Sequence, residues 1–411
     1  MAMRRALRGD RAARLRSRCA QLGPAVVVAA VLPAVVLGAT GGPVSSNGSS
    51  LARAVGGWRP LPPAPVAGRL GEGFVWTGRE LVIAGGVTRT RTGTARLPAD
   101  GAAYEPATRR WRVIAVPPGG VGAGAVWTGR RLVVWTGNGP AGPAAAASYD
   151  PVSDTWRRLA AGPLGPREGN ANLWTGKELL VIGGYRGDAA ATPVAAALDP
   201  ATGRWRTLHG LHGLSLFGGP NGAVWDGHEA IVAGKLSLCP QLGSACSRTR
   251  PVVVAYDPAT DRKRELGLPP FSASFGAGAA GSLTPVAWTR GTVIFRALIP
   301  GSLRVLGYRP STGRWRIGPR APCVLPHGTD TQTAWIGDRL VAACADGGLQ
   351  IYDPKSESWR RRTSTTGVSP LATRTGSAIA WTGRELVVWS GWTFERFNPT
   401  PASGASMVLA R

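Results

Sequence analysis

The sequence has 411 residues, a formal net charge of +25, 44% hydrophobic and 17% charged residues, 58 glycines and 34 prolines. The apolar content is ordinary for a globular protein and excludes a chain with too few apolar residues to form a core. Short apolar runs between turn residues favour strands over long helices. Arginine supplies most of the charge and favours anionic partners, but the arginines are spread along the whole chain, which argues against a nucleic-acid-binding patch. We therefore expect an all-β protein that does not bind nucleic acid.

The first 39 residues have the pattern of an export signal. Seven arginines against one acid, Asp10, precede the uncharged stretch Pro24–Ala39. Because positive charge stays on the cytoplasmic side of a membrane, we expect the rest of the chain to be extracytoplasmic. The apolar core contains Pro33 and is shorter than the roughly 20 residues of a membrane span. Residues 1–39 are therefore expected to be a cleaved signal peptide or an uncleaved signal anchor, and residues 40–56 a flexible linker.

A tryptophan followed by a Thr-Gly or related turn recurs along the remaining chain. The seven copies, spaced about 46 to 63 residues apart, are Trp76, Trp127, Trp174, Trp225, Trp288, Trp335 and Trp381. In the first copy, a short apolar strand ending at Trp76 is followed by Thr77-Gly78 and the apolar run Leu81–Ala84, which predicts a hairpin with a positive φ at the glycine. Self-similarity at this period is typical of repeated small sheets that cannot bury their faces alone.

The second half of each unit contains a tyrosine or leucine and a tryptophan seven residues apart. The pairs begin at Tyr104, Tyr149, Leu198, Tyr308 and Tyr352 and end at Trp111, Trp156, Trp205, Trp315 and Trp359. Most of these pairs enclose Asp-Pro, which favours a type I turn, so we predict a hairpin between the third and fourth strands. The fourth unit has Lys263 in place of the tryptophan, so we expect its outer strand to be less well packed.

Four strands per unit, the Tyr–Trp spacing, and Gly-Gly after the second strand at Gly85-Gly86 and Gly183-Gly184 resemble the kelch repeat of an exported bacterial type. This resemblance to the galactose oxidase-like superfamily implies a seven-bladed β-propeller of four-stranded antiparallel blades over residues 57–405, followed by a C-terminal tail, 406–411. The seventh unit lacks its outer tryptophan, whereas Trp58–Pro63 is unmatched at the other end of the chain. We expect this N-terminal strand to close the ring, with Ser406–Ala410 as the alternative for that place.

Four of the five cysteines form close pairs in the sequence. Cys239 with Cys246 and Cys323 with Cys344 are expected to form disulfides outside the cytoplasm. A metal site is the less favoured interpretation because neither pair has the Cys-x-x-Cys spacing.

Long, irregular connections between second and third strands and between blades are expected on one face of the propeller. Variable loops on a rigid ring often bind ligands, so we predict the binding site there. Candidate ligand-binding residues are Arg89, Arg91, Arg96, Arg167, Glu168, Asn170, Asn172, His209, His212, Asn221, His327 and Asp330. The alternative for each is a solvated loop residue or turn cap, and the repeated tryptophans are expected to pack between blades rather than stack on sugars.

No set of residues in the sequence identifies a reaction, and we expect no cofactor, metal or catalytic residue. The favoured interpretation is a monomeric, exported, non-catalytic binding or scaffold module for a protein, glycan or anionic wall polymer, touching a membrane only through the N-terminal segment. The alternative is a sugar-active enzyme on a kelch propeller, of the epimerase or oxidase type. A copper oxidase would need tyrosine and histidine ligands, and the chain has only four histidines.

Overall fold

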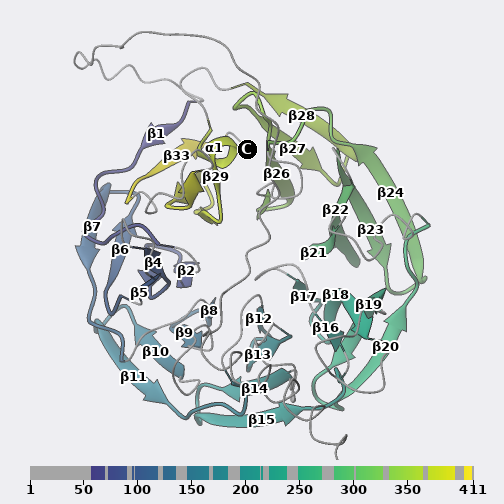
Figure 1. The fold of residues 1–411 in the computed structure, drawn as a ribbon, viewed down its shortest axis with the longest axis horizontal. Coiled ribbons are helices and arrows are strands. Elements are labelled where there is room, and N and C mark those ends of the chain that lie inside the picture. The colour runs from purple at the N-terminus through teal and green to yellow at the C-terminus, as the bar shows by residue number, and fades with distance from the viewer. Residues whose placement is uncertain are drawn as a thin grey trace, which may run out of the picture. The chain divides into compact units, whose positions relative to one another are not determined.

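Seven small antiparallel sheets stand around a ring as the blades of a β-propeller in the computed structural model (Figure 1). All of them belong to one compact unit, Arg53–Arg411. The structure describes residues 57–69, 73–89, 95–96, 98–118, 124–135, 146–165, 170–183, 195–212, 214–215, 222–237, 249–270, 282–299, 302–326, 333–363, 369–393 and 402–409. The expected signal segment and most of the expected linker lie outside these residues.

The first three blades have strands of four or five residues in chain order. Blade 1 consists of β2 (Gly73–Trp76), β3 (Leu81–Ala84), β6 (Gly101–Glu105) and β7 (Arg110–Val113). Blade 2 consists of β8 (Gly124–Trp127), β9 (Leu132–Trp135), β10 (Ala146–Asp150) and β11 (Thr155–Leu159). Blade 3 consists of β12 (Ala171–Trp174), β13 (Leu179–Ile182), β14 (Ala195–Asp199) and β15 (Arg204–Leu208).

Blades 4 and 5 have longer strands. Blade 4 consists of β17 (Ala223–Trp225), β18 (Ala230–Ser237), β19 (Thr249–Asp257) and β20 (Arg262–Leu266), and β16 (Leu214–Ser215) pairs with the far end of β18. Blade 5 consists of β21 (Ser282–Thr289), β22 (Thr292–Ile299), β23 (Ser302–Arg309) and β24 (Arg314–Arg320). The expected long connection between the second and third strands of blade 4 is bounded by Ser237 and Thr249, because both flanking strands are long.

Blades 6 and 7 complete the ring. Blade 6 consists of β25 (Thr333–Ile336), β26 (Arg339–Ala343), β27 (Leu349–Asp353) and β28 (Ser358–Arg362). Blade 7 consists of β30 (Ala378–Trp381), β31 (Glu385–Trp389), β33 (Gly404–Val408) and β1 (Arg59–Pro60). Outside the blades lie β4 (Thr88–Arg89), β5 (Ala95–Arg96), α1 (Pro370–Thr373), β29 (Arg374–Thr375) and β32 (Trp392–Thr393).

The ring is closed by the N-terminal strand, as predicted. The first strands of successive blades contact one another in chain order, and β30 of blade 7 contacts β2 of blade 1. Arg59 pairs with Ser406 and Pro60 with Ala405, so β1 is the outer strand of blade 7. The C-terminal run is the third strand of that blade rather than its outer strand, and β33 crosses the boundary at residue 405 where a tail was expected.

A buried arginine joins the two ends of the ring a second time. Arg69 is fully buried, and its backbone N–H donates to Oγ of Ser390, whose hydroxyl donates back to the Arg69 carbonyl, both at 2.8 Å. Its guanidinium donates to the Gly85 carbonyl at 3.1 Å and pairs with Asp100 at 2.7 Å. Since Ser390 follows β31 and Gly85 follows β3, this one side chain ties blade 7 to blade 1.

The core lies between neighbouring blades. Second strands such as Leu81–Ala84 and Leu179–Ile182 are buried along their whole length, as strands covered on both faces are. The apolar clusters join adjacent blades, and each of the seven repeated tryptophans packs at the edge of one of them. These tryptophans therefore act as wedges between blades.

The turns adopt the conformations predicted from their residues. Gly78 has φ 97° in the first hairpin of blade 1, and Oγ1 of Thr77 accepts hydrogen bonds from the two residues that follow the glycine. In blade 5, Arg290 takes the place of this glycine and also has a positive φ, 51°. A non-glycine residue in this region of backbone space is uncommon, so the arginine is a departure from the repeat. Among the described residues, no helix is long and apolar enough to cross a membrane.

Replacing Trp58 with alanine should weaken the ring closure. Trp58 is buried to 9% exposure and packs in the cluster with Met407 of β33, so we expect W58A to lower the free energy of unfolding by about 3 kcal/mol, as for other buried aromatic truncations. Chemical denaturation monitored by far-UV circular dichroism measures this change. The exposed neighbour Arg59 provides the control, since R59A should change stability by less than about 0.5 kcal/mol. Equal effects of the two substitutions would contradict this account of the closure.

Candidate functional site

In each of blades 1 to 6, a side chain of the outer strand donates a hydrogen bond to a backbone carbonyl that precedes the blade in the chain. The indole Nε1 atoms of Trp111, Trp156, Trp205 and Trp359 donate to the carbonyls of Pro62, Ala115, Ala160 and Pro319 at 2.9, 2.8, 2.8 and 3.1 Å. Trp315 donates in the same way to Gly267. In blade 4, Nζ of Lys263 donates to the His212 carbonyl at 3.1 Å. Lys263 thus supplies the hydrogen-bond donor that a tryptophan supplies at this position in other blades.

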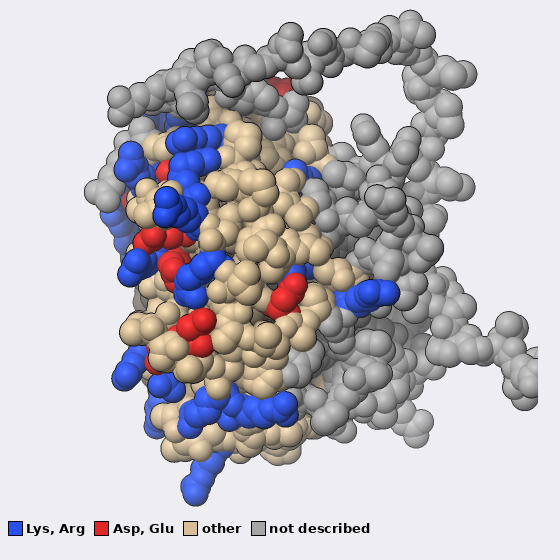
Figure 2. All heavy atoms as spheres, turned by 90° about the vertical axis from the view of Figure 1, so that its left-hand side faces the viewer, with Lys and Arg blue, Asp and Glu red and all other residues tan. Residues whose placement is uncertain are grey.

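A second repeated contact holds the arginine that follows the outer tryptophan or its replacement. In blade 1, Nε and Nη2 of Arg112 donate to the two carboxylate oxygens of Glu80 at 3.0 and 2.8 Å. Arg206 with Glu178 and Arg264 with Glu229 form the same two-point pair in blades 3 and 4. Figure 2, which faces the edge of the ring at blades 1 and 2, shows basic and acidic side chains gathered toward one margin of the described surface.

A third repeated contact uses the tyrosine at the end of the third strand. The hydroxyl of Tyr149 donates to Asp154 at 2.5 Å, and that of Tyr256 donates to Asp261 at 2.6 Å. Burial and these bonds raise the pKa of both tyrosines. Asp154 also accepts from the backbone of Ala115, in the connection from blade 1, at 3.1 Å. The tyrosine hydroxyl and the aspartate carboxylate are thus hydrogen-bonded to each other at the junction with the preceding blade.

The junction between blades 5 and 6 departs from this pattern at two positions. Thr292 stands where blades 1, 3 and 4 have the glutamate that holds the arginine, and Glu357 stands where blades 2 and 4 have the aspartate that holds the tyrosine. Arg316, the arginine of blade 5, instead reaches across to Glu357 of blade 6 at 2.7 Å, with its side chain 74% exposed. Blade 5 therefore lacks the Arg–Glu pair that blades 1, 3 and 4 have at this place.

A cavity of about 590 Å³ lies at this junction. Turns and strands of both blades line it: Thr289, Arg290, Thr292, Ile294, Gly307, Arg309, Thr312, Arg314, Trp315, Arg316, Gly318, Asp338, Tyr352, Pro354, Lys355 and Glu357. The five cationic and two anionic side chains give the lining an excess of positive charge. Because Lys355 pairs with Asp338 at 2.7 Å and Arg316 with Glu357, both carboxylates are already neutralised. We name this cavity the blade 5–6 pocket.

The structure places only part of the predicted site. Arg89 ends β4 and Arg96 lies exposed on β5, so the first long connection contains a small hairpin. Asn170 is buried at the start of β12 and donates to Asn172 at 3.0 Å. The candidates that lie outside the described residues are Arg91, Arg167, Glu168, Asn221, His327 and Asp330.

His209 and His212 form a turn that packs on blade 4. The backbone N–H groups of His209 and Gly210 donate to Asp261, and the carbonyl of His212 accepts from Lys263. Both histidines are exposed. Their backbones therefore serve the junction between blades 3 and 4, and the turn contacts a short third-to-fourth turn. Over the described ranges, no three His, Cys, Asp or Glu side chains lie close enough together to hold a metal ion.

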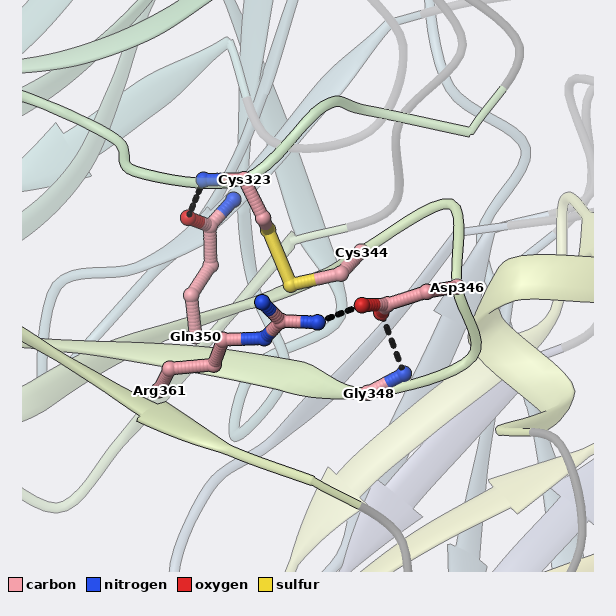
Figure 3. The surroundings of a disulfide bond; sticks show 6 residues. All are labelled: Cys323, Cys344, Asp346, Gly348, Gln350 and Arg361. Carbon is pink, nitrogen blue, oxygen red and sulfur yellow. Dashed lines mark hydrogen bonds and ion pairs between the residues drawn. A yellow bond between two sulfur atoms is a disulfide. The ribbon is translucent and has the colours of Figure 1, made fainter.

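One of the two predicted disulfides is present. Cys323 and Cys344 form a bond that joins the connection after blade 5 to the residue that follows β26 (Figure 3). Arg361 pairs with Asp346 beside it, Asp346 accepts from the Gly348 backbone at 3.0 Å, and Gln350 accepts from the Cys323 backbone at 3.4 Å. Cys239 and Cys246 lie outside the described residues.

The residues of the blade 5–6 pocket were not among the sequence candidates. Short, stereotyped turns were expected to be structural, and the prediction concentrated on long connections. The signal that identifies the pocket is a break in the repeat, because Thr292 and Glu357 replace residues whose partners, an arginine and a tyrosine, are retained. Arg290 lies in the adjoining turn and replaces the glycine that the other six blades have there.

No family model matches the chain, and no curated protein matches its sequence. Among solved structures, a fungal alcohol oxidase of the AA5 family in complex with copper is similar, with a TM-score of 0.59 and 13% sequence identity. The similarity covers 86% of this chain and 76% of the oxidase chain. At this identity the comparison shows the propeller fold alone.

Removing the disulfide should destabilise the propeller without unfolding it. The bond closes a loop with a sequence separation of 21 residues. Loop-closure entropy then predicts a loss of about 3 kcal/mol in the free energy of unfolding for the C323S/C344S double variant. Denaturation of the oxidised wild type, the reduced wild type and the double variant measures it. Reduction of the wild type should lower stability to the level of the double variant, and an oxidised wild type no more stable than the variant would contradict the prediction.

Proposed function

We propose that this chain is an exported, non-catalytic kelch-like propeller that acts as a binding or scaffold module for an anionic partner. A protein, a glycan or a wall polymer would each provide such a partner. The blade 5–6 pocket carries the proposal, because its lining has five cationic side chains against two anionic ones. The fold does not require a pocket at this place, since blades 1, 3 and 4 have an Arg–Glu pair there.

The charge of the whole chain supports the same partner class. A net charge of +25 attracts anionic surfaces over several ångströms and favours encounter with them. The long connections add Arg89 and Arg96 as possible further contacts, together with Arg91 and Arg167 in the sequence. The arginine-rich start of the chain and its uncharged stretch support export, after which the propeller would be secreted or held at the membrane by its N-terminal segment.

The alternative function, a sugar-active enzyme of the epimerase or oxidase type, has weaker support. The oxidase with a similar structure binds copper, but a likeness at 13% identity transfers no activity to this chain. The described tyrosine hydroxyls of blades 2 and 4 are hydrogen-bonded to aspartates in structural contacts. We therefore place binding ahead of catalysis.

Binding should be selective for anionic polymers and sensitive to salt. We expect the full chain to be retained on an immobilised acidic polysaccharide but not on a neutral one, with affinity falling at least about tenfold as ionic strength rises from low to high. Biolayer interferometry measures both. Equal retention on the two polymers would refute the proposed partner class.

The same assay tests the two candidate faces. Alanine replacement of Arg89, Arg91 and Arg167 removes the charges of the long connections, whereas glutamine replacement of Arg290 and Arg314 removes charges of the blade 5–6 pocket. We expect the pocket pair to cause the greater loss of affinity. A greater loss in the long-connection variant would assign binding to that face instead.

Export predicts where the protein accumulates. In cells expressing the full chain, we expect it in the extracytoplasmic or membrane fraction, and a variant lacking residues 1–39 should remain in the cytoplasm. Fractionation with immunodetection measures the distribution. Retention of the full chain in the cytoplasm would contradict the proposal.

A further inference from the structure

Three arginines of the blade 5–6 pocket are available to a ligand. Arg290, Arg309 and Arg314 come from the two short turns of blade 5, and all three are exposed. Within the described part of the chain, no carboxylate forms an ion pair with any of them, unlike Arg316 and Lys355 in the same pocket. Guanidinium groups bind phosphate, sulfate and carboxylate oxygens through paired N–H donors. These arginines therefore provide the charge for an acidic group.

A tyrosine hydroxyl in the same pocket lacks the aspartate acceptor that the matching tyrosines of blades 2 and 4 have. Tyr352 is 4% exposed and lines the cavity, and its counterparts Tyr149 and Tyr256 donate to aspartates of their own turns. At the corresponding place Glu357 is turned toward Arg316, and the described residues supply no other acceptor for the Tyr352 hydroxyl. Burial, with a smaller contribution from Glu357, raises the pKa of Tyr352 to about 12. The group therefore keeps its proton at neutral pH and can donate it to an anion.

The remaining lining suits a ligand that carries hydroxyl groups as well as charge. Asp338 and Glu357 would repel a bare anion, but each is neutralised by a cation and retains free lone pairs that can accept from hydroxyls. Thr289, Thr292 and Thr312 add hydroxyls, and Ile294 and Pro354 add apolar surface. The volume of about 590 Å³ is within the roughly 300 to 1,000 Å³ of small-molecule sites.

From these observations we infer that the blade 5–6 pocket binds an acidic sugar, a sugar unit bearing a phosphate, sulfate or carboxylate group. The acidic group lies among Arg290, Arg309 and Arg314 and accepts from Tyr352, and the sugar hydroxyls donate to Asp338 and Glu357. The inference rests on the proposed function and narrows its partner to a glycan. Thr292, which stands where blades 1, 3 and 4 have a glutamate, lines the site and leaves room for the ligand.

Titration calorimetry with small probes tests the inference on the full chain. The probes are glucose 6-phosphate, glucose 6-sulfate, glucuronate, glucose and inorganic phosphate. We expect at least one acidic sugar to bind, and to bind at least about tenfold more tightly than glucose or inorganic phosphate, because only acidic sugars use both halves of the site. The three acidic probes distinguish which group the arginines prefer. Binding of inorganic phosphate as tight as that of every acidic sugar would overturn the assignment to a sugar.

Two variants locate the site. Thr292→Glu restores the residue found in blades 1, 3 and 4, so it should recreate the pair with Arg316, fill the pocket and lower acidic-sugar affinity about tenfold or more. The melting temperature of T292E should be unchanged or higher, which separates loss of binding from loss of folding. Arg314→Gln should also lower affinity about tenfold. Arg204→Gln is its matched control, because Arg204 is exposed and precedes the outer tryptophan of blade 3.

The outcomes separate this inference from the proposed function. Unchanged sugar affinity in T292E, or equal losses in R314Q and R204Q, would overturn the pocket assignment. If the chain binds acidic polymers but none of the acidic sugars, the proposed function stands and the inference fails. If it binds neither, both fail.

Discussion

The structure depends on the pairing of β1 with β33. Seven blades pack side by side, and the strand from the beginning of the chain closes them into a ring. It is held by two residue pairs with β33, by the hydrogen bond from the Leu61 backbone N–H to the Gly404 carbonyl, and by the burial of Trp58. Arg69 adds a second fastening at the same junction, with Ser390 on one side and Gly85 on the other. Without a closed ring, blades 1 and 7 would each expose an apolar face, and the rim contacts would lack their partners on one side.

Within the closed ring, a few polar contacts recur at several junctions, and departures from them are informative. Lys263 preserves the hydrogen bond of the outer position without an aromatic ring, since its ammonium group donates to the preceding connection as the indoles do. Thr292 is a departure of the other kind, because no residue of blade 5 replaces the glutamate, and Arg316 pairs with Glu357 of blade 6 instead. The first departure preserves a junction, whereas the second leaves a cavity with cationic walls.

The sequence predicted most of the fold because the fold is periodic. The spacing of Trp76 and its equivalents gave the number of blades, the glycine after Thr77 gave the hairpin, and the unmatched Trp58 gave the closure. Long-range details were less accessible. The extension of β18 and β19 into an expected loop depends on sheet pairing, which local residue types do not specify. The pocket could not be predicted from any one turn, since it depends on residues of two blades. Arg316 of blade 5 lacks a glutamate at position 292 and pairs with Glu357 in a turn of blade 6.

The separation of β1 and β33 also constrains how the protein reaches its final form. Their paired residues, Arg59 and Ser406, lie at opposite ends of the chain, so the outer strand of the last blade is made first and its partner last. In a chain that emerges N-terminus first, Trp58 and Leu61 remain without their partners in β33 until the intervening blades have been made. Closure of the ring joins residues that are among the most distant in the sequence, so we expect it late in folding. Until then, the open edges of blades 1 and 7 stay exposed to proteases and to other chains.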